Sequence, residues 1–106
     1  MRDISIKKIK LMFDYSSSCL WDNSYREKYG TMIEAEDINL SLFIENKINK
    51  WCLKMDKLFF TEIFGGRLTR KIIKNSNKYK RYKKEQLFLS KLISRNTGLK
   101  VSLVYE

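Results

Sequence analysis

The chain has 106 residues, of which 43% are hydrophobic and 13% are aromatic. This composition is typical of one packed domain over residues 1–106 and excludes a chain that is disordered along its whole length. Its 22 Lys and Arg outnumber its 12 Asp and Glu, so the formal net charge is +10 and anionic partners are favoured. No apolar run approaches the roughly 20 residues that span a bilayer, and charges up to Lys10 interrupt any signal-peptide core. We therefore expect a soluble, cytoplasmic protein.

The two cysteines, Cys19 and Cys52, lie far apart, and the sequence contains no histidine. Without a secretion signal, we interpret both cysteines as reduced thiols rather than as a disulfide. The lack of histidine removes the commonest general base and the commonest metal ligand, and two separate cysteines do not supply a zinc site. We therefore expect neither enzymatic activity nor a metal or other cofactor.

The first predicted element is a strand over residues 8–15, where Ile9, Leu11 and Phe13 alternate with the side chains between them. The strand ends at a serine-rich turn. Residues 16–36 are predicted to be loop with short local structure.

From Ser41 onward the spacing of the apolar residues becomes helical. Ile44, Ile48 and Trp51 lie on one face, so Trp51 is a predicted core residue. We expect this helix to begin after Ser41, a favourable N-cap, and to end near Lys57.

A second helix is predicted over residues 78–96, after a break at 75–77. Its inward stripe is expected to contain Tyr82, Gln86, Leu89, Leu92 and Ile93. Gly98 stands where a helix-ending glycine belongs. Residues 99–106 alternate again and predict a final strand.

These elements predict an α/β (α+β) fold, in which a small sheet built from the N- and C-terminal strands packs against two main α-helices. Two strands make a thin sheet. A third strand is expected from residues 30–36, from residues 57–64, or from a second copy of the protein. The last option would produce a homodimer through a sheet edge.

Residues 65–84 carry most of the net charge, because they hold nine Lys or Arg and no Asp or Glu. The basic residues are Arg67, Arg70, Lys71, Lys74, Lys78, Lys80, Arg81, Lys83 and Lys84. Such a stretch is typical of a surface that binds nucleic acid or an acidic protein. The lysine-rich composition of the whole chain is an alternative explanation for some of these lysines. Tyr79 and Tyr82 could stack on single-stranded bases, but Tyr82 is in phase with the core stripe. A membrane-surface role is disfavoured.

The carboxylates cluster in the N-terminal third, and the cluster contains Asp14, Asp22, Glu34, Glu36 and Asp37. A metal-dependent nuclease could use such a cluster. Glu36 and Asp37 also precede a predicted helix, where negative charge is favourable, and we prefer this structural interpretation.

Three segments resemble one family of small bacterial proteins: "IKLMFDYSSSCLWD" (9–22), "IEAEDINLSLFIENKINKW" (33–51) and "SRNTGLKVSLVYE" (94–106). The shared motifs are Met12-x-Asp14-Tyr15, Leu20-Trp21 and Asp37 to Ser41. The family is similar to the immunity proteins of contact-dependent growth inhibition and other polymorphic toxin systems. The resemblance implies an α/β fold without catalysis, and binding to the toxic C-terminal domain of a cognate effector, commonly a nuclease. The family's acidic middle is replaced here by the basic stretch.

The predicted partner is therefore a cognate toxin domain, with DNA or RNA as the alternative. The basic stretch 67–84 is the first candidate for the contact surface. Trp21 and Tyr25 are the second, since aromatic residues anchor interfaces, although Trp21 could instead cover the core. Acidic residues are candidates against a basic toxin surface: Glu34, Glu36 and Asp37.

Overall fold

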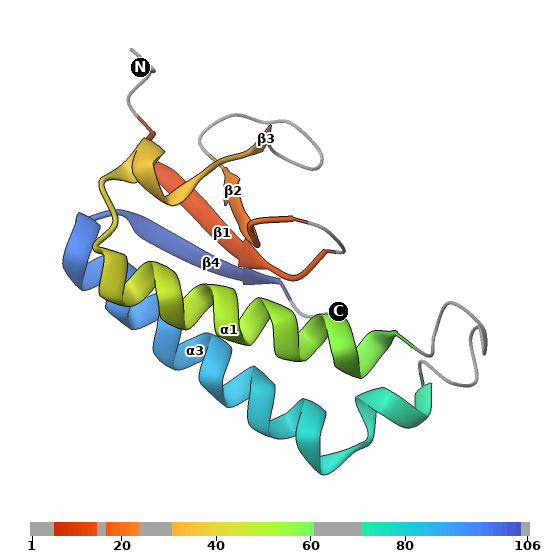
Figure 1. The fold of residues 1–106 in the computed structure, drawn as a ribbon. Coiled ribbons are helices and arrows are strands. Elements are labelled where there is room, and N and C mark those ends of the chain that lie inside the picture. The colour runs from red at the N-terminus through yellow and green to blue at the C-terminus, as the bar shows by residue number, and fades with distance from the viewer. Residues whose placement is uncertain (1–5, 15–16, 24–30, 61–70, 105–106) are drawn as a thin grey trace.

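The computed structural model describes residues 6–14, 17–23, 31–60 and 71–104 (Figure 1). Its elements are β1 (Lys8–Met12), β2 (Leu20–Asp22), β3 (Thr31–Met32), the 3-10 helix η1 (Ala35–Ile38), α1 (Leu42–Phe59), α3 (Asn77–Thr97) and β4 (Lys100–Val104). Residues 71–74 are also helical and lead into α3 through Asn75 and Ser76.

Within the described residues, the sheet has four strands in the order β3-β2-β1-β4. β1 pairs antiparallel with β2 and parallel with β4, so the first and last strands of the chain are neighbours. The prediction of a sheet built from the N- and C-terminal strands beside two main helices is confirmed. β4 lies at an edge, where a homodimer could add a strand, and that dimer stays a prediction.

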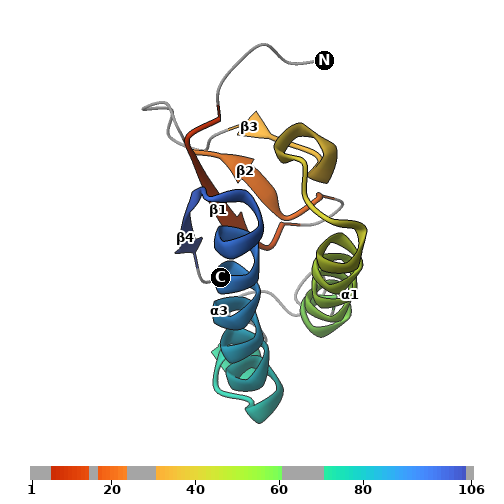
Figure 2. The ribbon, with the colours of Figure 1, turned by 90° about the vertical axis from the view of Figure 1, so that its left-hand side faces the viewer.

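Both helices lie on one side of the sheet, as the view nearly along their axes shows (Figure 2). Ile9 and Leu11 of β1 face them and are fully buried. Lys10 has Trp21 and Ser102 as its strand partners and therefore lies on the opposite face. The core thus sits between one face of the sheet and the two helices.

The helix ends follow the predicted capping residues. The hydroxyl of Ser41 accepts the backbone N–H of Ile44 at 3.4 Å, which confirms it as the N-cap of α1. Gly98 ends α3 with φ at 74°, a left-handed conformation that glycine adopts without strain. α3 extends one residue beyond the predicted helix at each end.

Gln86 joins α3 to the sheet from inside the core. Its side-chain amide donates to the carbonyl oxygens of Leu11 at 2.7 Å and Val104 at 3.0 Å. A buried amide needs such partners, because an unsatisfied polar group costs about 1–3 kcal/mol. The predicted inward position of Gln86 is confirmed, and these bonds hold the helix over β1 and β4.

The N-terminal third differs from the predicted strand-then-loop arrangement. β1 ends at Met12, although Phe13 continues the buried face; Tyr15 lies outside the described residues. The third strand comes in part from residues 30–36, as Thr31–Met32. Leu20–Asp22 forms another strand where loop was predicted, because three residues are too few to show alternation.

The prediction of two reduced cysteines was wrong: Cys19 and Cys52 form a disulfide, with their Cα atoms 6.4 Å apart. The bond ties the turn after β1 to the middle of α1 across 33 residues of sequence. Cys52 lies on the flank of α1 that faces this turn, and folding therefore brings together two cysteines that share no sequence motif.

Reducing this disulfide is expected to lower the free energy of unfolding by about 4 kcal/mol, because the crosslink restricts a loop of intermediate length in the unfolded chain. Urea unfolding with and without a reductant measures the difference. The variant Cys19→Ala/Cys52→Ala serves as the control, because its unfolding must not respond to the reductant. Superimposable curves for the oxidised and reduced wild type would contradict the expectation.

Candidate functional site

The solvent side of α3 carries a row of cations at helical spacing. Tyr79, Gln86 and Leu89 point into the core, so the residues on the other side of the helix face solvent. We call this surface the basic face, and it consists of the exposed residues Lys80, Arg81, Lys84, Leu87, Phe88, Lys91 and Arg95. Glu85, the one acidic residue of α3, instead pairs with Lys54 of α1 at 3.2 Å. The basic face therefore has no acidic residue of α3 within it.

Two apolar side chains sit in the middle of the basic face. Leu87 is 44% exposed and Phe88 is 55% exposed. Lys84 precedes Phe88 by one helical turn, and Lys91 follows Leu87 by one turn. An apolar centre within a charged rim is the usual composition of a protein–protein contact surface.

The sequence-predicted basic residues do not all share this face. Lys71 and Lys74 are exposed in the helical turn before α3, and Lys78 is exposed in its first turn. Lys83 is half-buried, with its Nζ 5.6 Å from the centre of the Tyr79 ring. Arg67 and Arg70 lie outside the described residues.

The two tyrosines of the basic stretch serve the core. Tyr79 is 4% exposed and meets Phe59 edge-on, with ring centres 5.7 Å apart. Tyr82 is half-buried and packs against the core, as its phase predicted. Because both rings pack against the core, neither is exposed for stacking on nucleic-acid bases. The composition of the stretch therefore does not support base stacking by these tyrosines.

Trp21 lies on the sheet face that is turned away from the helices. It is half-buried, and its Nε1–H donates to the carbonyl oxygen of Met12 at 3.1 Å. Its strand partners place it beside Lys10 and Met32 rather than in the helix-covered core. Tyr25, the other predicted anchor, lies outside the described residues.

The acidic residues around η1 have a local structural role. The carboxylate of Asp37 accepts the backbone N–H of Glu34 at 2.9 Å and forms a capping box. Glu34 and Glu36 remain exposed. The backbone N–H of Ser41 donates to the side-chain oxygen of Asn96 of α3 at 3.0 Å, which ties the segment after η1 to the C-terminal end of α3.

The carboxylates do not assemble into a metal site in the part of the chain that the structure describes, where no group of three or more His, Cys, Asp or Glu could hold an ion. Asp22 is buried on the helix side of β2, whereas Glu36 is exposed on η1. The structure therefore gives no geometric support to the metal-dependent nuclease alternative.

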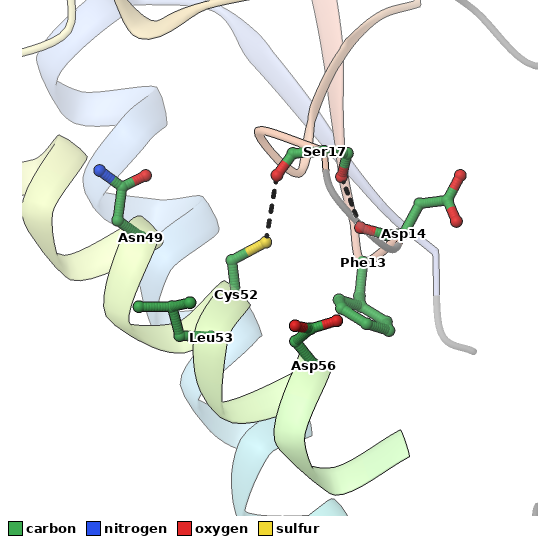
Figure 3. Close-up of a pocket in the computed structure, with 7 residues that line it drawn as sticks. All are labelled: Phe13, Asp14, Ser17, Asn49, Cys52, Leu53 and Asp56. Carbon is green, nitrogen blue, oxygen red and sulfur yellow. Dashed lines mark hydrogen bonds between the residues drawn. The ribbon is translucent and has the colours of Figure 1, made fainter. Parts of the chain in front are cut away.

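A pocket of about 370 Å³ opens between α1 and the turn after β1 (Figure 3). The carboxylate of Asp56 points toward this turn, and the sulfur of Cys52 points toward Ser17. The pocket is lined by Phe13, Asp14, Ser17, Asn49, Cys52, Leu53 and Asp56. The sequence does not predict this pocket, because its lining residues come from two segments that meet only in the fold.

No model of a known protein family matches the chain, and no curated protein is significantly similar to it. Among the described residues, no helix is long and apolar enough to cross a membrane.

Proposed function

We propose that the chain is a cytoplasmic immunity protein that binds the toxic C-terminal domain of a cognate effector and neutralises it by direct contact. The observation that carries the proposal is the basic face of α3, in which exposed Leu87 and Phe88 are surrounded by cations. An exposed phenylalanine on a rigid helix provides an anchor for a partner's pocket. The surrounding charge provides partner discrimination and a faster association.

The positive charge of this surface supports an acidic patch on the partner as its contact. Lys80, Lys84 and Lys91 favour an acidic patch on the toxin domain. A nuclease toxin is basic where it meets nucleic acid, so such a patch would lie away from its active site. The exposed Glu34 and Glu36 offer a separate, acidic contact around η1.

Co-purification tests this proposal directly. The probe is the C-terminal domain of the secreted effector whose gene adjoins the gene for this chain. We expect a stoichiometric complex that survives gel filtration at physiological salt. A gene without an adjoining effector, or an effector domain that elutes separately, would count against an immunity function.

Binding to DNA or RNA is the second candidate, because the basic face presents a row of cations suited to phosphates. The buried Tyr79 and the exposed apolar pair argue against it, since nucleic-acid surfaces are more polar. If it operates, log K should fall with log salt by about 0.9 for each phosphate neutralised on duplex DNA. Absence of binding to duplex or single strands at low salt would dispose of this candidate.

A further inference from the structure

The two sulfurs of the Cys19–Cys52 disulfide differ in their access to solvent. Cys19 is completely buried. Cys52 is half-buried and lines the pocket between α1 and the turn after β1 (Figure 3). A thiolate must reach the sulfur atom that it attacks, and the pocket leads to one of the two.

We propose that Cys52 is a thiol–disulfide exchange site, at which a low-molecular-weight thiol forms a mixed disulfide. The sulfur of the incoming thiolate bonds to Sγ of Cys52, and the bond from Cys52 to Cys19 breaks. The electron pair leaves with Cys19, which takes up a proton and becomes a thiol. The incoming thiol has lost one proton and Cys19 has gained one, so the step balances without another oxidant or reductant.

The space around the two sulfurs differs. Cys19 is packed within the core, where its sulfur leaves no room for an adduct. Sγ of Cys52 lies 3.6 Å from the carbonyl oxygen of Ser17, the residue at the pocket side of the turn. A modified Cys52 can place its adduct in a pocket of about 370 Å³ without displacing core side chains.

The turn does not depend on the disulfide alone for its position. The carbonyl of Cys19 accepts the backbone N–H of Met12 at 3.0 Å. The hydroxyl of Ser18 bonds to the carbonyl of Ile33 at 2.5 Å. These bonds remain when the sulfurs separate, so the exchanged form is expected to stay folded at 25 °C with its adduct in place.

The charge at the pocket selects among thiols. Asp56 lies one helical turn from Cys52 on α1 and lines the pocket, and none of the lining residues that the structure describes is Lys or Arg. Although the whole chain is strongly basic, a cationic thiol is therefore favoured at this site and an anionic thiol is disfavoured. This site and its selectivity do not depend on the proposed immunity function.

The test uses the oxidised full-length protein without denaturant. Cysteamine and glutathione are added separately at equal thiolate concentration, and samples are quenched by acid, alkylated and mapped by peptide mass spectrometry. We expect the adduct on Cys52 and the alkylated thiol on Cys19. Cysteamine is expected to react about tenfold faster than glutathione, and added salt should reduce this ratio.

Two results would overturn the proposal. The first is an adduct found mainly on Cys19, or in equal amounts on both cysteines. The second is an exchange reaction that occurs only when denaturant is added. The variant Asp56→Asn tests the charge effect with the disulfide intact. We expect it to bring the rates for cysteamine and glutathione closer together. Glu36→Gln removes an exposed carboxylate outside this pocket and is the control, so an equal change in both variants would contradict selection by the pocket.

Discussion

Replacing Trp51 with alanine is expected to lower the stability of the fold by several kcal/mol, about as much as one truncation in a core costs. Trp51 is fully buried in α1 and is the largest fully buried side chain among the residues that the structure describes. Its Nε1–H also donates to the carbonyl oxygen of Tyr82 in α3 at 3.0 Å. Truncating a buried tryptophan costs about 3–5 kcal/mol, from lost burial and the cavity that remains.

Thermal unfolding followed by circular dichroism measures this loss. For a chain of this length, we expect Trp51→Ala to lower Tm by about 15 °C or more. Leu42→Ala provides a matched control, because it truncates a large apolar side chain of the same helix that is 70% exposed. If Trp51→Ala and Leu42→Ala had the same Tm, α1 and α3 would not pack as described.

The second large effect is expected on binding rather than on folding. The triple variant Lys80→Glu/Lys84→Glu/Lys91→Glu reverses three exposed charges of the basic face. Opposed like charges across an interface cost several kcal/mol, so the affinity for the effector domain should fall by at least about 100-fold. The fold should not change, since exposed substitutions usually alter stability by less than about 0.5 kcal/mol.

A matched triple variant separates this surface from the charge of the whole chain. Lys50→Glu/Lys57→Glu/Lys100→Glu makes the same change in net charge at exposed positions of α1 and β4. Isothermal titration calorimetry against the effector domain should show near-native affinity for this variant. Equal losses in the two triple variants would mean that net charge alone governs the interaction.

The helices could be predicted from the sequence because local signals mark their ends. Ser41 and Gly98 carry capping chemistry that depends on their own backbone neighbourhoods, and the apolar spacing through Trp51 fixes the buried face. The strand pairing has no such signal. β2 has three residues and β3 has two, and the parallel pairing of β1 with β4 depends on the path of the chain between them.

The candidate site could be predicted only in part. Charge density predicted Lys80, Arg81 and Lys84, whereas Phe88, which falls outside the predicted inward stripe, was not among the predicted contact residues. The basic stretch is continuous in the sequence, but in the structure the turn at Asn75 and Ser76 separates its earlier helical residues from α3. Contacts between distant segments, such as the disulfide, leave no periodic pattern, so the pocket could not be found by spacing.

The most direct measurement of the proposed function is the growth of cells that express the effector's C-terminal domain. We expect co-expression of this chain to restore growth. We expect the variant Lys80→Glu/Lys84→Glu/Lys91→Glu, produced at the same soluble level, not to restore it. Growth arrest with the wild-type chain, or full rescue by the variant reversed on the basic face, would contradict neutralisation through this surface.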